Sequence, residues 1–231
     1  MTDAPLFLDR KQAGEKLASV IQAQLKAMAS DNTYEPIVYA LPRGGIPIAV
    51  PIANSLSCPL TVLVAKKISH PGNPELAIGA VTASGEALWM QQKLFRFRPD
   101  SLWRQKAMEA AINKAKSLEA DFLPYCPQVN PKGAILILVD DGIATGMTIA
   151  VAAKALSKLS PAQIWLVAPL APPGMLSWLQ EWCNSLDEQI KYRIVVLATP
   201  EPFVSVSSFY AHFPQVGTSE ALEYLRTGRG V

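Results

Sequence analysis

Cysteine and histidine are scarce in this chain, with three of the first and two of the second among 231 residues. Cys58, Cys126 and Cys183 are odd in number, lie far apart and lack metal-ligand spacing, so we expect reduced thiols in a cytoplasmic protein. No apolar run reaches the roughly 18 residues that a membrane span needs. Residues 1–9 contain no basic stretch followed by an apolar one, so we expect neither a signal peptide nor a membrane partner.

An excess of charge of one sign is also missing, because 21 Lys and Arg residues are balanced by 19 Asp and Glu residues. The basic residues are dispersed, which argues against a nucleic-acid partner, although a local site for a small anion needs only a few cations. One basic run is interpreted either as a solvated face or as a subunit edge that reaches a neighbour's active site. Its members are Lys93, Arg96, Arg98, Arg104 and Lys106.

Short apolar runs predict the strands of a core. They are rich in β-branched residues and alternate with helical segments, which is typical of a parallel sheet covered on both faces. The runs span residues 37–41, 60–65, 134–139, 164–168 and 194–198. We therefore predict a doubly wound α/β fold with a mainly parallel, five-stranded sheet. A single domain is expected over residues 1–231, with its core at about 34–200 and a small cap formed by 200–231 together with 1–30.

Other segments predict what surrounds the sheet. Asp9 is a candidate N-cap for an amphipathic opening helix, and a second helix is expected over residues 100–123. Residues 77–82 and 87–90 flank the sequence Ala-Ser-Gly-Glu, which predicts a β-hairpin inserted between the second and third strands of the sheet.

The most informative segment is residues 135–148, where a strand-like run ends in two acids and a small-residue turn before a helix. Parallel α/β folds bind ligands at the carboxyl edge of the sheet, and a helix N-terminus offers unpaired N–H groups and a positive dipole end. Gly142 and Gly146 allow close backbone approach, and the hydroxyls of Thr145 and Thr148 can donate to phosphate oxygens. This turn is therefore a candidate phosphate cradle.

Asp140 and Asp141 need another partner, because carboxylates repel phosphate. Sugar hydroxyls or a divalent cation would suit them, so a sugar phosphate with a metal ion satisfies the acids and the turn together. The alternative is a capped turn with one acid as N-cap and the other solvated, which is costly at the end of a buried strand. The Gly-Lys-Ser/Thr signature of nucleoside triphosphatases and the G-x-G-x-x-G of dinucleotide sites are both absent.

Residues 139–148, Val-Asp-Asp-Gly-Ile-Ala-Thr-Gly-Met-Thr, resemble the motif with which type I phosphoribosyltransferases bind 5-phosphoribosyl-1-pyrophosphate (PRPP). The resemblance implies that the paired acids face the ribose hydroxyls and that the following loop wraps the 5′-phosphate. The motif would contribute Asp140, Asp141, Gly142, Ala144, Thr145, Gly146, Met147 and Thr148 to the PRPP site.

Two further strings fit the same family. Residues 40–45, Ala-Leu-Pro-Arg-Gly-Gly, resemble its pyrophosphate loop, to which Arg43 would bring charge and Gly44 and Gly45 backbone donors. Residues 73–80, Asn-Pro-Glu-Leu-Ala-Ile-Gly-Ala, occur together with Leu-Pro-Arg-Gly-Gly in a branch of the family whose substrate is uncharacterised.

Lys66 and Lys67 end the second predicted strand, and both are expected to bind PRPP. The polar residues 68–75 that follow resemble the family's mobile catalytic loop, which closes over the departing pyrophosphate. Lys67 is the expected second pyrophosphate contact. His70 is either a further donor or a solvated bystander.

The tail suggests an acceptor site. Residues 199–210 resemble the purine-binding segment of hypoxanthine phosphoribosyltransferases, which implies that Phe203, with Val204, contacts the acceptor. The alternative is that Phe203 belongs to the core. Hypoxanthine enzymes carry an acid where this chain has Ala144, and the loop instead resembles that of adenine enzymes. A general base is therefore not assigned, and the acceptor stays open.

The expected reaction transfers ribose 5-phosphate from PRPP to a nitrogen nucleophile with release of pyrophosphate. Arg43, Lys67, Asp140 and Asp141 are the expected catalytic residues, with Mg²⁺ held mainly by PRPP rather than by protein ligands. Many relatives are dimers, so a homodimer is expected. The rivals are a non-catalytic sensor of PRPP or nucleotides on the same fold and a phosphatase or nucleosidase that uses water as the acceptor.

Overall fold

The computed structural model describes residues 5–28, 34–90 and 102–228, apart from the side chains of residues 74 and 75. Its core is a five-stranded sheet in which all neighbouring strands are parallel. From edge to edge the strands are β2 (Leu60–Val62), β1 (Pro36–Ala40), β6 (Ile135–Val139), β7 (Gln163–Leu170) and β8 (Lys191–Ala198). The predicted doubly wound α/β fold is confirmed.

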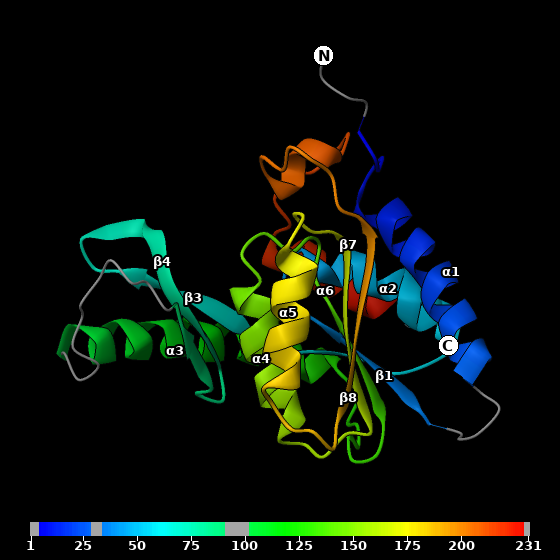
Figure 1. Cartoon of the computed structure of the whole chain (residues 1–231), viewed down its shortest axis with the longest axis horizontal. Helices are drawn as coiled ribbons and strands as arrows, with labels where there is room; N and C mark the ends of the chain where they lie inside the picture. The colour runs from blue at the N-terminus through cyan, green and yellow to red at the C-terminus, as the bar shows by residue number, and fades with distance from the viewer. Residues whose placement is uncertain (1–4, 29–33, 91–101, 229–231) are drawn as a thin grey trace.

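Successive residues of the central strands enter two separate cores. Ile135, Ile137 and Val139 of β6 belong to one core, and Leu136 and Leu138 belong to the other, so the whole strand is buried. The first core contains side chains of α1 (Arg10–Met28), α2 (Gly45–Leu56) and α6 (Thr218–Thr227). The second contains side chains of α4 (Met147–Ser157) and α5 (Met175–Asn184), and Figure 1 shows α1 and α5 on opposite sides of the sheet.

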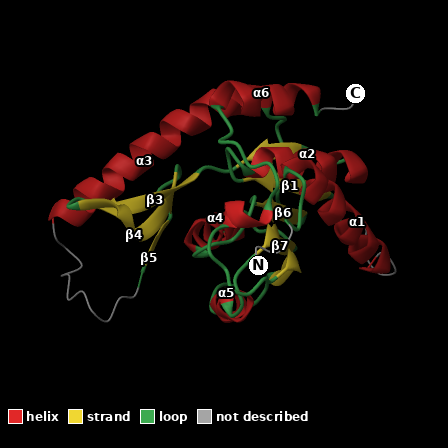
Figure 2. Ribbon diagram, turned by 90° about the horizontal axis from the view of Figure 1, so that it is seen from above, coloured by secondary structure: helices red, strands yellow, loops and turns green. Residues whose placement is uncertain are grey.

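A second, three-stranded antiparallel sheet stands beside the main one. It contains β3 (Ala65–His70), β4 (Asn73–Thr82) and β5 (Ala87–Trp89), and α3 (Leu102–Phe122) packs on it through a small core around Ile68, Ile78 and Val81. Figure 2 shows this sheet and α3 extending away from the main sheet. The hairpin of β4 and β5 agrees with the prediction from the sequence.

Two details of this region differ from the sequence-based expectation. The apolar run 60–65 is not one strand, because β2 ends at Val62 and Ala65 already pairs with Thr82 in the other sheet. Residues 68–75 are not a loop, because most of them lie in β3 and β4 around a tight turn at residues 71–72. Polar composition suggested a loop, but pairing of β3 with β4 and burial of Ile68 against α3 stabilise strands there.

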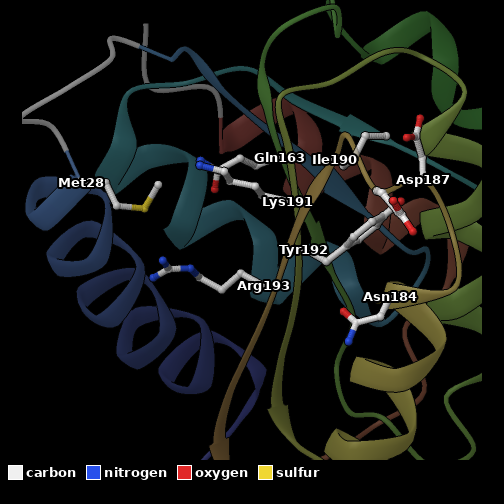
Figure 3. Close-up of a pocket in the computed structure, with 10 residues that line it drawn as sticks. Met28, Gln163, Asn184, Asp187, Ile190, Lys191, Tyr192 and Arg193 are labelled. Atoms are coloured by element: carbon white, nitrogen blue, oxygen red, sulfur yellow. The ribbon is translucent and has the colours of Figure 1, made fainter.

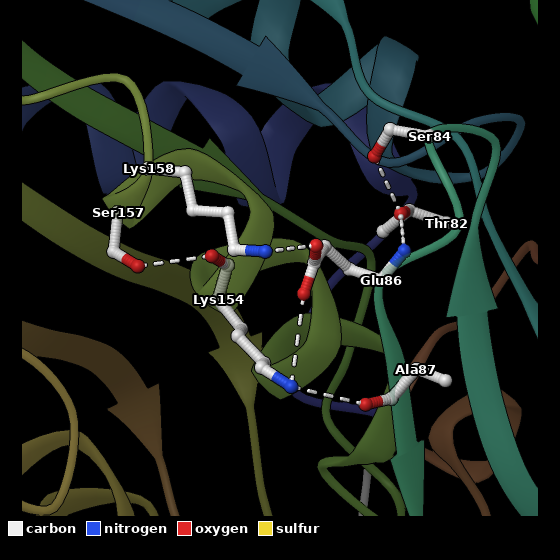
Figure 4. A network of polar contacts seen from close by, with 7 residues as sticks. All are labelled: Thr82, Ser84, Glu86, Ala87, Lys154, Ser157 and Lys158. Carbon is white, nitrogen blue, oxygen red and sulfur yellow. Dashed lines mark hydrogen bonds and ion pairs between the residues drawn. The ribbon is translucent and has the colours of Figure 1, made fainter.

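An ion-pair network attaches the β4–β5 turn to α4 (Figure 4). Glu86 pairs with Lys158 and, at 3.6 Å, with Lys154, whose ammonium also donates to the carbonyl of Ala87 at 3.3 Å. Thr82 accepts a hydrogen bond from the Glu86 amide at 3.1 Å. The small sheet is thereby fixed to the helix that follows the acid pair.

A segment before α1 and a segment after β8 meet in the cap. Phe7 forms a parallel bridge with Tyr210, and the amide of Ala211 donates to the carbonyl of Phe7 at 2.8 Å. Short 3₁₀ helices at Leu123–Tyr125 and Val206–Phe209 complete the secondary structure of the described segments. Asp9 caps α1 as predicted, since its carboxylate accepts the amide of Gln12 at 2.8 Å. Across these segments, none of the helices combines the length and the hydropathy that a membrane span requires.

Candidate functional site

The acid pair lies at the carboxyl end of β6, in the middle of the main sheet. The amide of Asp140 continues the sheet by donating to the carbonyl of Val167 at 3.0 Å, and its carboxylate accepts the amide of Asp141 at 2.9 Å. The carboxylate of Asp141 accepts a hydrogen bond from Nε of Arg10 at 3.0 Å, and its backbone carbonyl accepts one from the hydroxyl of Tyr210 at 2.7 Å. The pair is therefore held by the strand below it and by the cap above it.

Burial and mutual repulsion make the pair electrostatically unusual. Burial raises the pKa of Asp140 well above its ordinary value, and the neighbouring charge of Asp141 raises it further. Burial also raises the pKa of Asp141, whereas the guanidinium of Arg10 lowers it. Two carboxyls in such an environment hold a proton more readily than exposed ones, and Arg10 favours the ionised form of Asp141.

The turn after the acids has the features of an anion cradle. Gly146 adopts φ +69° immediately before α4. The first amides of that helix, as in any α-helix, have no intrahelical acceptors and can bind an anion. The buried side chain of Ile143 and a 2.9 Å bond from its amide to Leu170 anchor the turn, while Ala144 and Thr145 are exposed. A Cβ on Gly142 would meet Val206 at 2.5 Å, so the cap closes directly over the start of the turn.

The loop 41–45 lies against the acid pair, although the two are separated by about 100 residues in the sequence. A Cβ on Gly44 would come within 2.0 Å of the Asp141 carboxylate, and a Cβ on Gly45 within 2.6 Å of the Val139 carbonyl. Only glycine permits this approach. The structure thus brings together two of the three segments that the sequence singled out.

The side chain of Arg43 donates to the hydroxyl of Thr218 in α6 at 3.4 Å. Lys66 of β3 lies near Arg43. Its pKa is lowered by burial, and further by the charges of Arg43 and Lys114. Lys67 is exposed, and its charge lowers the pKa of Asp140. Of these predicted pyrophosphate contacts, Lys67 thus acts on the acid pair, whereas Arg43 and Lys66 lie close to each other.

The predicted acceptor residues lie in the cap. Phe203 packs on Phe209 with ring centroids 5.4 Å apart and contributes to the core on the α1 side of the sheet, while Val204 is 80% exposed. His70 faces Trp103 at 5.3 Å. Of the basic run, Arg104 stacks over Trp89 at 4.1 Å, whereas Lys93, Arg96 and Arg98 lie outside the described residues.

Several hollows lie near the sheet ends, among them the following two. One of about 580 Å³ surrounds the first residues of β7 and β8, at the opposite end of the sheet from the acids (Figure 3). The other, of about 540 Å³, adjoins the anion cradle on its outer side. It is lined by Leu88, Trp89, Met90, Thr145, Met147, Met175, Trp178 and Trp182.

Several residues at the site were not found from the sequence. Arg10 and Tyr210 contact Asp141, Val206 covers Gly142, and Met175 and Trp178 close on Gly146. These contacts join distant parts of the chain. An isolated arginine or tyrosine carries no local pattern that would have indicated them.

Comparison with known proteins adds independent findings. The family model described as "Phosphoribosyl transferase domain" matches residues 8–201. Proteins from two Mycobacterium tuberculosis strains, named "Putative phosphoribosyl transferase" MT0597 and Rv0571c, are 32% identical over 229 residues, covering 95% of this chain and 46% of theirs. The chain therefore spans about half the length of these curated relatives. The crystal structure of TT1426 from Thermus thermophilus superposes with a TM-score of 0.74 at 28% identity, covering 97% of this chain and 99% of that one.

Proposed function

The chain belongs to the phosphoribosyl transferase family, and from this premise we propose that it transfers ribose 5-phosphate from PRPP to a nitrogen nucleophile and releases pyrophosphate. One observation carries the proposal. The acid pair, the anion cradle and the glycine loop meet at one edge of the sheet, with Gly44 in contact with Asp141. A sugar, a phosphate and a diphosphate in a single ligand match these three parts in that order.

The proposed binding mode assigns each part of PRPP to one segment. The 5′-phosphate would lie on the amides at the start of α4 and the hydroxyls of Thr145 and Thr148, with the backbone of Ala144, Gly146 and Met147 around it. The ribose hydroxyls would donate to Asp140 and Asp141. The pyrophosphate would lie on the amide of Gly44, beside Arg43, Lys66 and Lys67. The amide of Gly45, which was also expected to contribute, donates to the carbonyl of Leu41 at 3.0 Å.

The proposed chemistry is electrostatic and positional. The bond between the anomeric carbon and pyrophosphate breaks, a bond from that carbon to the acceptor nitrogen forms, and the acceptor loses a proton. Lys67 and Arg43 would stabilise the negative charge that develops on the leaving group. Asp140 and Asp141 would hold the ribose ring as it becomes cation-like.

Magnesium fits this scheme as a companion of the substrate. Among the residues that the structure describes, no group of three or more His, Cys, Asp and Glu side chains could hold a metal ion. In the proposed scheme Mg²⁺ would be held by PRPP oxygens and water, and it would neutralise charge on the pyrophosphate. We also propose a cytoplasmic location and a homodimer, which rest on the cysteine usage and on the family resemblance respectively.

The test is calorimetric titration of PRPP with Mg²⁺, followed by a screen for pyrophosphate release with purines, pyrimidines and other nitrogen compounds. Binding with acceptor-dependent release supports the transferase and identifies the acceptor. Release without any acceptor indicates a hydrolase, and binding without release indicates a sensor. Failure to bind PRPP rejects the proposal.

A matched pair of variants locates the site. Asp141→Asn should abolish PRPP use while the protein stays folded. Asp187→Asn makes the same chemical change at the opposite end of the sheet, beside the hollow in Figure 3, and should leave PRPP use intact. Equal activity of the two variants would refute the ribose assignment.

A further inference from the structure

Arg10 is a buried cation that contacts several parts of the site. Its side chain is only 9% exposed, and its Nε contacts the Asp141 carboxylate at 3.0 Å. Its Nη1 donates to the carbonyl of Pro214 at 2.8 Å, and the guanidinium stacks on Phe213 at 3.5 Å from the ring centroid. These contacts hold the guanidinium in one position between the opening helix, the acid pair and the cap.

The contact with Asp141 is selective for one oxygen. Oδ2 accepts from Arg10 and lies over Gly44, whereas Arg10 does not contact Oδ1. The side chain of Asp141 is 20% exposed, so a ligand can reach it. A short carboxylate that is anchored at one oxygen presents the other in a fixed direction, which favours recognition of a hydroxyl group.

We propose that Arg10 is the positioning residue of the ribose site, which fixes Asp141 and keeps it ionised so that it accepts hydrogen bonds from the ribose hydroxyls. The inference rests on the proposed function and extends it to a residue outside the three family segments. Arg10 would not touch the substrate; it acts through Asp141.

The charges around Asp141 support this role. Asp140 forms a side-chain hydrogen bond with Asp141 that lowers its pKa, and Lys67 lowers the pKa of Asp140 from β3. Tyr210 donates to the backbone carbonyl of Asp141, whereas Arg43 donates to Thr218 in α6. Arg10 is the cation that contacts Asp141 directly and lowers its pKa against the effect of burial. Without Arg10 the two carboxyls should share a proton up to higher pH, because the largest of the effects that offset burial at Asp141 is then lost.

The test compares two ligands that differ by one hydroxyl group, ribose 5-phosphate and 2-deoxyribose 5-phosphate. The ratio of their dissociation constants cancels the repulsion between phosphate and the acids, so it reports on hydroxyl recognition. A hydrogen bond to a charged group predicts a ratio of about 10 or more for the native protein at pH 8. The ratio is measured by calorimetry between pH 5 and pH 9 for native, Arg10→Gln and Arg10→Lys proteins.

For Arg10→Gln we expect the pH at which the ratio is half maximal to rise by at least about one unit. Arg10→Lys keeps the charge and should retain most of the native profile. Arg193→Gln is the matched control, because Arg193 also ties its strand to α1, through Gln24 at 3.0 Å, and stacks on Trp165, but lies at the other end of the sheet. It should lower the melting temperature without moving the profile.

The outcomes separate the inference from the proposed function. If the native protein discriminates between the ligands and Arg10→Gln has the native profile, the inference about Arg10 is wrong. It is also wrong if Arg10→Lys, folded, behaves like Arg10→Gln. If the native protein shows no discrimination at any pH, the ribose assignment itself fails.

Discussion

Gly44→Ala is the substitution whose effect the geometry defines most closely. Gly44 has φ −60° and ψ −32°, which alanine adopts without strain, so any effect must come from the added methyl group. That methyl would lie 2.0 Å from the Asp141 carboxylate, whereas Cβ contacts below 3.0 Å are essentially never observed. Either the carboxylate or the loop must therefore move by at least 1.0 Å, the difference between 3.0 and 2.0 Å.

Either movement costs free energy. Asp141 is held by Arg10 and, through its backbone, by Tyr210, and the loop is held by Gly45 against the Val139 carbonyl. Overpacking of this kind costs about 1–3 kcal/mol. In a protein of this size, a loss of about 2 kcal/mol lowers the melting temperature by about 4–8 °C. We expect the dissociation constant for PRPP to rise at least about tenfold, because the substitution displaces a charged hydrogen-bonding group.

Thermal melting and calorimetric titration of PRPP measure both effects. Gly217→Ala is the control, since Gly217 has φ −76° and a Cβ there meets nothing within 4 Å. It should cost less than about 1 kcal/mol as a change of helix cap and leave PRPP binding unchanged. Native stability and native affinity in Gly44→Ala would show that the glycine loop and Asp141 are not in contact.

Three further predictions concern Gly142, the buried acid Asp140 and two buried thiols. Gly142→Ala should destabilise the protein by about 1–3 kcal/mol, because its methyl group would lie 2.5 Å from Val206. In a double-mutant cycle measured by denaturant unfolding, adding Val206→Ala should restore most of the lost free energy of unfolding. Asp140→Asn should raise the melting temperature more at pH 8 than at pH 5. A carboxyl with a raised pKa stabilises the fold only while it is protonated, and this contribution is lost as pH rises. An equal change in melting temperature at both pH values would contradict the raised pKa. Burial raises the pKa of Cys58 to about 11 and that of Cys183 to about 12, so both thiols should react with a disulfide reagent at pH 8 at least about a hundredfold more slowly in the native than in the unfolded protein.

The parts of the fold that were predictable share a physical signature. Strands buried on both faces appear as continuous apolar runs, and β1, β6, β7 and β8 all lie where such runs occur. The position of the acids and the small-residue turn between a strand end and a helix start was predictable, because these parts are consecutive in the sequence. These features could be predicted because each depends on residues that are neighbours in the sequence.

The parts that were missed depend on partners far away in the sequence. The change of sheet between Val62 and Ala65 leaves the apolar run unbroken, because both strands are partly buried. Residues 68–70 form a strand only because β4 pairs with them and α3 covers Ile68. Arg10 was missed for the same reason, since its partners Asp141 and Pro214 lie 131 and 204 residues away.

These long-range contacts bear on how acceptor choice could change without loss of PRPP binding. The hydroxyl of Tyr210 donates to the carbonyl of Asp141, and the carbonyl of Pro214 accepts from Arg10, so these cap residues help to hold the proposed ribose site in place. Val204, in contrast, is 80% exposed, and Phe203 packs on Phe209 within the cap. Substitutions at Tyr210 would disturb the acids whatever the acceptor is, whereas substitutions at Val204 would change the surface of the cap and leave the acid pair in place. Under the proposed function, the variable determinants of the acceptor are therefore expected at Phe203 and Val204, and the cap residues that contact Asp141 and Arg10 are expected to tolerate little change.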